Sequence, residues 1–124
     1  MKQIQLQNAA KNPGHYSPGM ITGNTLYVSG QLPVRPEDRS IPQGLRAQVI
    51  QCLDNVETVL KEAGFSRKDI VMCRVYLSDI DAWDELNAVY GEWFGDHKPA
   101  RVVVPVPALH YGALVEIEAV AELG

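Results

Sequence analysis

Two residues near the C-terminus have types and surroundings that could do chemistry. Arg101 stands at the start of an apolar, β-branched run in HKPARVVVPVP (97–107), and Glu116 lies in ALVEIEAVAE (113–122). A guanidinium matches a planar carboxylate with two parallel donors, and an acidic group beside it can act as acid, base or water-orienting group. The residue types give the hypothesis that Arg101 binds a carboxylate and that Glu116 works beside it, although spacing alone favours the simpler alternative. The alternative is that the two side chains pair with each other or with solvent.

Other patterns give weaker signals. His15, His97 and His110 have no metal-ligand spacing, so we predict no metal site. The glycines of GHYSPGMITG (14–23) lack the Gly-Lys-Ser/Thr pattern of a phosphate loop, which gives nucleotide binding little support.

Cysteine and aromatic residues are interpreted as structural. Cys52 and Cys73 each lie in an apolar pattern, which favours small buried hydrophobic residues over a disulfide or a catalytic thiol. Trp83, Tyr90 and Trp93 recur at helical spacing and are predicted to belong to the core.

Strands and loops must position Arg101 and Glu116. Alternation and β-branched content predict strands over 2–8, 25–31, 70–78, 100–106 and 113–122. Loops rich in proline and glycine are expected at 12–19 and 34–44. The last two strands are joined by the short segment PALHYG (107–112), which suggests an antiparallel pair. Literal alternation along that pair puts Arg101 and Glu116 near its non-helical side.

Two helices are predicted. From about Pro42 to Ala63, apolar residues recur every three or four positions, and Gly64 follows where a helix commonly ends. A second helix begins with Asp81 as its N-cap and ends near Gly95. Its apolar face carries Trp83, Leu86, Tyr90, Trp93 and Phe94.

The strand faces predict an oligomer. The uniformly apolar faces, expected under the helices, carry Val71, Cys73, Val75 and Leu77 on one strand and Val115, Ile117, Ala119 and Ala121 on the other. The opposite faces mix apolar and charged residues, including Arg74 and Glu118. The preferred interpretation of Glu118 is a structural ion pair, either with Arg74 or with another subunit. A surface too apolar for open water and too charged for a core is typical of a subunit interface, so we predict a homo-oligomer.

Length and charge limit the function classes. The 124 residues suit one domain, expected to span 1–124. A formal net charge of −4 with interspersed charges indicates neither nucleic-acid nor membrane binding. No apolar segment is long enough to span a bilayer or resembles a signal peptide, so a cytoplasmic location is expected.

Seven segments give the chain a family resemblance. HYSPG, LYVSGQLPV, NVETVLKEAGFS, VYLSDI, LNAVYGEWF, PARVVV and VEIEAVAE occur in the order and spacing of the Rid (YjgF) family of reactive intermediate deaminases. The resemblance implies an α+β, chorismate-mutase-like fold, in which two helices back one face of a mixed sheet. It also implies a homotrimer with sheets inward and active sites between subunits. The implied activity is cofactor-free hydrolysis of 2-imino and enamine acids, such as 2-aminoacrylate and 2-iminobutyrate, to 2-keto acids and ammonia.

The resemblance also implies the site residues. The carboxylate-binding arginine of the family matches Arg101, and the water-positioning glutamate matches Glu116. Substrate-binding positions match Tyr16, Gly30, Asn87 and, through its backbone, Val103.

Departures from the family pattern bear on the substrate. Val103 and Pro105 stand where relatives commonly have Cys or Thr and then an acidic residue, and VPALHYGA (106–113) replaces a commoner Leu-Pro-Lys-Asp-Ala-type connection. His15 stands where proline is commoner. An alternative function is a non-catalytic module that binds small carboxylates or regulates a partner through the same intersubunit clefts. Chorismate mutation has only the shared fold in its favour.

Overall fold

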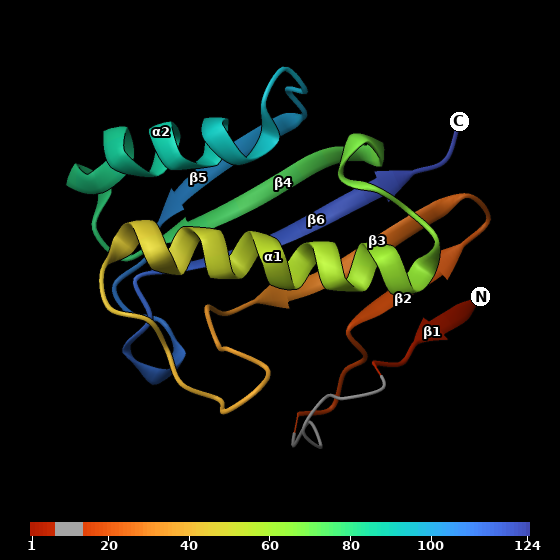
Figure 1. Ribbon diagram of the computed structural model, residues 1–124, viewed down its shortest axis with the longest axis horizontal. Coiled ribbons are helices and arrows are strands. Elements are labelled where there is room, and N and C mark those ends of the chain that lie inside the picture. The colour runs from red at the N-terminus through yellow and green to blue at the C-terminus, as the bar shows by residue number, and fades with distance from the viewer. Residues whose placement is uncertain (7–13) are drawn as a thin grey trace.

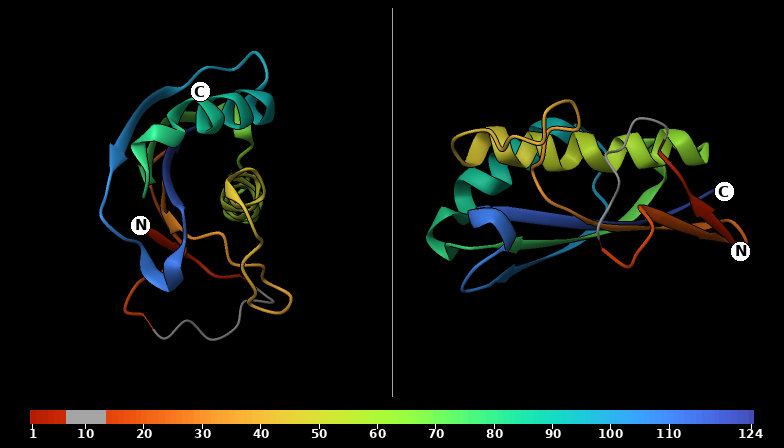
Figure 2. Two further views of the ribbon diagram at one scale, coloured as in Figure 1. Left: turned by 90° about the vertical axis from the view of Figure 1, so that its left-hand side faces the viewer. Right: turned by 90° about the horizontal axis from the view of Figure 1, so that it is seen from below.

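A six-stranded sheet carries two helices on one face. The computed structural model describes residues 1–6 and 14–124. The strands are β1 (Lys2–Ile4), β2 (Gly19–Thr22), β3 (Thr25–Gln31), β4 (Ile70–Leu77), β5 (Ala100–Pro105) and β6 (Val115–Glu122), and the helices are α1 (Leu45–Ala63) and α2 (Trp83–Phe94). Within residues 1–6 and 14–124, both α-helices lie on the same side of the sheet and the other face carries no α-helix (Figures 1 and 2). The predicted α+β fold with a mixed sheet is confirmed.

The order of the strands corrects one expectation. The sheet runs β1-β2-β3-β6-β4-β5, with β4 and β5 parallel and the other neighbours antiparallel. The predicted pairing of β5 with β6 is therefore wrong, because β4 lies between them. The connection α2 brings the chain back parallel to β4, as parallel pairing requires.

The N-terminal strands differ from expectation in extent. The sequence pattern did not predict β2, a four-residue strand joined to β3 by the turn at Gly23 and Asn24. The predicted first strand begins as β1, while its residues 7 and 8 lie outside the described residues. Residues 12 and 13 of the predicted loop at 12–19 do so as well.

Glycines end both helices where predicted, but the start of α2 differs. Gly64 follows α1 in the left-handed conformation at φ 83°, which glycine adopts without steric cost. Gly95 follows α2. Asp81 is not the N-cap of α2, because a 3₁₀ turn (Ile80–Ala82) precedes the helix and Asp79 accepts the backbone N–H of Asp81.

Strand faces follow the predicted alternation in β6 but not throughout β4. The apolar face of β6 is buried under the helices as expected; its members are Val115, Ile117, Ala119 and Ala121. In β4 the register with β6 slips by one residue between Ile70 and Met72. Ile70 is consequently buried and Val71 is exposed, the reverse of the prediction.

Most residues predicted to be structural are buried. Cys52 and Cys73 are free thiols in the core, and burial raises the pKa of the Cys73 thiol to about 11. Tyr90 is buried and Trp93 is partly buried. The prediction that Trp83 belongs to the core is wrong, because 38% of its surface is exposed.

The open face of the sheet is mixed, as predicted. The guanidinium of Arg74 pairs with Glu118 at 3.6 Å, which confirms the expected ion pair, and Tyr76 donates a hydrogen bond to the same carboxylate. Tyr27 is half exposed on this side. Among the described residues, neither helix has the length and apolar character needed to cross a membrane.

Candidate active site

Arg101 lies on the helix side of the sheet. Its Nη1 donates a hydrogen bond of 3.1 Å to Oδ1 of Asn87 in α2. Its guanidinium carbon lies 4.8 Å from the ring centre of Tyr90 and 5.5 Å from that of Trp83, within cation–π range. No carboxylate within residues 1–6 and 14–124 forms an ion pair with it. The guanidinium is therefore held in place without charge compensation from those residues.

The strand register explains the direction of Arg101 and corrects the prediction. Arg101 is paired with Cys73 across the parallel β4–β5 ladder, and Cys73 lies in the core under the helices. Paired residues on neighbouring strands project to the same side, so Arg101 does too. The expectation that it lies on the non-helical side is wrong.

Glu116 projects from the opposite, open face. It is paired with Tyr76 in the β4–β6 ladder. The β3–β6 register slips by one residue between Val28 and Gln31, and Gly30 lies within this bulge. A Cβ built on Gly30 would lie 2.6 Å from Oε2 of Glu116, so the absence of a side chain there makes room for the carboxylate.

The surroundings of Glu116 favour proton uptake. Partial burial is the main reason that the pKa of Glu116 is raised, and the negative charge of Glu118 raises it further. His110 acts in the other direction and lowers this pKa. A carboxylate with a raised pKa is a better base than one at its ordinary value, which suits an acid-base role.

The other predicted site residues divide between the two faces. Asn87 and Val103 lie with Arg101, since Asn87 binds it and Val103 packs partly against the core beside β4. Gly30 lies with Glu116. Tyr16 is exposed in the loop before β2. Ser29 binds the same loop through two hydrogen bonds, from its hydroxyl to the carbonyl oxygen of residue 17 and from its backbone N–H to that of residue 18. The loop that carries Tyr16 is thus anchored to the bulge of Gly30.

Sequence reasoning missed the roles of three residues. Trp83 and Tyr90 contact Arg101, although helical spacing predicted only core positions for them. The signal was present in their spacing with Asn87, because positions i, i+4 and i+7 share one helix face. His110 influences Glu116 from the connection before β6, which only the folded chain reveals.

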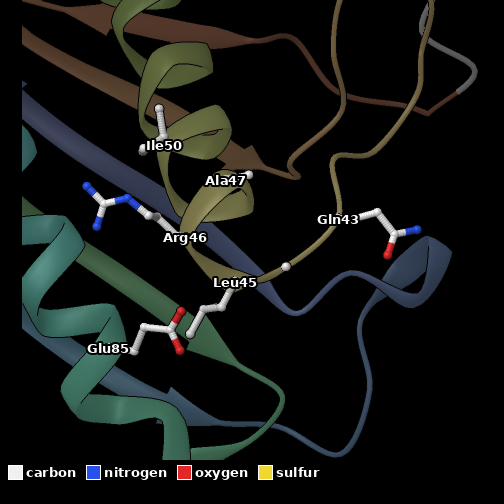
Figure 3. Close-up of a pocket in the computed structure, with 7 residues that line it drawn as sticks. Gln43, Leu45, Arg46, Ala47, Ile50 and Glu85 are labelled. Atoms are coloured by element: carbon white, nitrogen blue, oxygen red, sulfur yellow. The ribbon is translucent and has the colours of Figure 1, made fainter.

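A separate hollow lies at the start of α1. It has a volume of about 400 Å³ and is bordered by Gln43, Leu45, Arg46, Ile50 and, from α2, Glu85 (Figure 3). None of the predicted site residues lines it. Within the described parts of the chain, no three His, Cys, Asp or Glu side chains are grouped so that they could hold a metal ion.

One chain therefore presents the two candidate groups, Arg101 and Glu116, on opposite faces of its sheet. The helix face offers an anchored guanidinium, and the open face offers a carboxylate with a raised pKa. The sheet itself separates them, so a single chain does not bring the two groups to one small ligand. Two copies of the chain could bring them together, with Arg101 supplied by one copy and Glu116 by the other.

The sequence and the fold of the chain are similar to those of known proteins. The family model described as endoribonuclease L-PSP matches residues 6–123. A RutC family protein of Sulfurisphaera tokodaii is 42% identical over 100% of both chains. The 2-iminobutanoate/2-iminopropanoate deaminase of Escherichia coli is 37% identical over 97% of this chain and 96% of its own. The structure of Escherichia coli TdcF with bound serine covers 100% of both chains with a TM-score of 0.94 and 33% identity. The chain belongs to the Rid/YjgF/RutC family, to which the endoribonuclease L-PSP model corresponds.

Proposed function

We propose that this protein hydrolyses small 2-imino and enamine acids to 2-keto acids and ammonia in the cytoplasm, without a cofactor. The observation that carries the proposal is the anchored, uncompensated guanidinium of Arg101, which matches the carboxylate of such a substrate. The relative named 2-iminobutanoate/2-iminopropanoate deaminase supports the same substrate class. The formal net charge of −4 favours a small carboxylate bound by one arginine over RNA, which requires a broad basic surface.

The reaction needs few groups. Arg101 holds the carboxylate. An enamine first takes up a proton from solvent on its β-carbon and so becomes an imine protonated on nitrogen. Water then attacks the carbon of the C=N bond while Glu116 accepts a proton from that water. Glu116 gives that proton to the nitrogen of the resulting carbinolamine. The C–N bond then breaks and ammonia leaves as the C=O bond forms, while the hydroxyl proton passes to the Glu116 carboxylate and from there to ammonia or solvent. One water is consumed for each ammonia released. The raised pKa of Glu116 supports its use first as base and then as acid.

An active site between subunits reconciles the positions of Arg101 and Glu116. The open sheet face of one copy carries Glu116, Gly30 and the loop with Tyr16, while the edge strand β5 carries Arg101. If β5 of one subunit lies against the open face of the next, both groups border one cleft. A closed ring of three subunits with sheets inward, as the family resemblance implies, would repeat that cleft at each interface. A monomeric mass by light scattering would contradict this arrangement.

A carboxylate-binding or regulatory module is the second candidate. The solved relative with bound serine favours it, because serine is a carboxylate without an imine. A pure binder gains little from a second negative group in the cleft, whereas a hydrolase needs one. Retention of Glu116 together with Arg101 therefore supports the enzyme.

The proposal is tested by ammonia and keto-acid release from imines generated in place. A dehydratase acting on serine or threonine supplies 2-aminoacrylate or the homologous enamine, and release is compared with and without the protein. We expect acceleration by wild type and a loss of about 100-fold or more in Arg101→Ala, since one charge-assisted pair contributes several kcal/mol when water is excluded. Arg101→Lys should also lose most activity, because it keeps the charge but not the fork.

The matched control is Arg46→Ala. Arg46 is exposed and pairs with Glu92 between the helices, and the hollow that it borders is lined by none of the candidate site residues. It should retain activity while changing the net charge as Arg101→Ala does. Keto-acid binding without acceleration in wild type would favour the binding module and contradict the hydrolase.

A further inference from the structure

The face of α2 that meets Arg101 is built from three side chains. Trp83, Asn87 and Tyr90 occupy positions i, i+4 and i+7 of the helix, which place them along one side. All three contact the guanidinium, two through aromatic rings and one through a hydrogen bond. The arrangement surrounds the cation with neutral partners.

Neutral partners matter for anion binding. A carboxylate next to Arg101 would hold the guanidinium equally well but would compete with an incoming anion for it. Aromatic faces and an amide oxygen stabilise the cation without cancelling its charge. Asn87 occupies one hydrogen of Nη1, and a guanidinium has five N–H donors. Within the described parts of the chain, the guanidinium makes no hydrogen bond besides that to Asn87, so the edge formed by Nε and Nη2 is available for a two-pronged bond to a planar carboxylate.

The rings of Trp83 and Tyr90 differ in exposure. Tyr90 is buried and packs against Phe94 with ring centres 4.7 Å apart, so its position is fixed by the core. Trp83 begins α2 and is 38% exposed, so little of the core depends on it. An exposed tryptophan that contacts a cation is a residue whose removal can change the site without unfolding the protein.

We propose that Trp83 and Tyr90 are positioning residues for Arg101, forming an aromatic clamp that orients its guanidinium toward the carboxylate of a substrate. The proposal rests on the function proposed above for its substrate, while the clamp itself can be tested without turnover. Asn87, which the family resemblance implies as a substrate contact, acts in this arrangement by fixing the guanidinium.

The first test compares Trp83→Leu with Trp83→Phe. The leucine variant fills space without an aromatic face, and we expect its Kd for 2-oxobutanoate, measured by titration calorimetry, to rise about fivefold. KM for the imine should rise by a similar factor while kcat changes less, since the carboxylate contact is made in both ground and transition states. Trp83→Phe should restore a large part of the affinity. Equal affinity of Trp83→Leu and wild type for the keto acid would overturn the clamp.

The second test observes the guanidinium directly. A proton held over aromatic rings resonates upfield, so the Nε–H signal of Arg101, assigned by its loss in Arg101→Lys, should lie upfield in wild type. It should move toward the position of an ordinary arginine in Trp83→Leu and return part of the way in Trp83→Phe. An unchanged signal in Trp83→Leu contradicts the clamp even if the protein hydrolyses imines. A shifted signal in a protein without turnover or keto-acid binding supports the clamp and refutes the proposed function.

Discussion

The carboxylate of Glu116 occupies the space beside Gly30 that a side chain would need. A Cβ on Gly30 would lie 2.6 Å from Oε2 and 3.2 Å from the carboxyl carbon of Glu116. The atoms that a Cβ would displace are the carboxyl atoms at the end of the flexible Glu116 side chain. The φ angle of Gly30 is not positive, so an alanine there does not strain the backbone. A substitution here is expected to move the carboxylate more than it strains the fold.

Gly30→Ala should therefore reduce imine hydrolysis with little loss of stability. We expect kcat/KM to fall by about tenfold to 100-fold, because a misplacement of about 1 Å can cost that much. The melting temperature should stay within a few degrees of wild type. Initial rates and thermal unfolding of the same preparation test both statements.

Gly19→Ala provides the opposite control. Its Cβ would lie 2.9 Å from Cγ1 of Val59 and 3.2 Å from the carbonyl oxygen of Tyr27, both in packed surroundings. Overpacking of this kind costs about 1–3 kcal/mol of unfolding free energy. If Gly30→Ala is the more destabilising of the two, the close contact with Glu116 is structural rather than functional.

Periodicity predicted the elements better than their arrangement. The helix ending at Gly64 and the buried face of β6 follow from local pattern, because one residue type recurs with one period. The slip at Ile70 in β4 is set by pairing with β6, which no local pattern records. Pairing across the sheet also determines that β5 lies beside β4 rather than beside β6. The short segment that joins β5 to β6 is compatible with either position, so the sequence does not distinguish them.

The same limit applied to the site. Alternation shows which residues of β5 share a face, but it does not show which face the helices cover. Arg101 was assigned to the wrong side for that reason, and the contacts with Asn87 and Trp83 followed only from the fold. The identities of Arg101 and Glu116 as candidates came from residue type and family resemblance, and their roles stay predictions.

Neighbouring charges should shift the acid limb of the pH–rate profile. Glu116 must be ionised to accept a proton from water, so activity should fall as pH decreases through its raised pKa. Glu118→Gln removes a negative charge that raises this pKa, and the acid limb should move to lower pH. His110→Ala removes a group that lowers it, and the limb should move to higher pH. Profiles of kcat/KM for the three proteins test the two directions.

The directions must be opposite for this explanation to hold. A shift of the same sign in both variants would indicate a general change in the site rather than an electrostatic effect on Glu116. Raising ionic strength should reduce both shifts, because salt screens partly exposed charges.

Arg67 joins the two helices through several contacts. Its Nε and Nη2 bind the Glu57 carboxylate of α1, its Nη1 donates to the carbonyl of Trp93 in α2, and its guanidinium lies 3.7 Å from the Trp93 ring centre. Removing it in Arg67→Ala should lower the free energy of unfolding by about 1–3 kcal/mol, a range reduced for partial exposure. Denaturant unfolding at neutral pH measures this loss, and a change below about 0.5 kcal/mol would contradict it.

The contribution of this contact should depend on pH. The hydrogen bond from Arg67 is the main reason that the pKa of Glu57 is lowered from 4.5. A lowered pKa in the folded state gives stability that is present above the unfolded pKa and is lost as pH falls through the folded one. The difference between wild type and Arg67→Ala should accordingly be full at neutral pH and shrink below about pH 4.5.

Mixed oligomers test whether Arg101 and Glu116 from different subunits act together. Arg101→Ala and Glu116→Gln should each be inactive alone, and a one-to-one mixture is unfolded and refolded to exchange subunits. If each site takes its arginine from one subunit and its glutamate from the next, about a quarter of the sites receive both intact groups by random assembly. The mixture should then recover about a quarter of wild-type activity.

A second mixture distinguishes the two geometries independently. The double variant Arg101→Ala/Glu116→Gln is mixed in equal amounts with wild type under the same conditions. Sites shared between subunits should retain about a quarter of the full rate, whereas sites within one subunit should retain about half. Because Arg101 and Glu116 project from opposite faces of one sheet, we expect the lower value. No recovery in the first mixture together with about half in the second would require both groups to meet within a single chain.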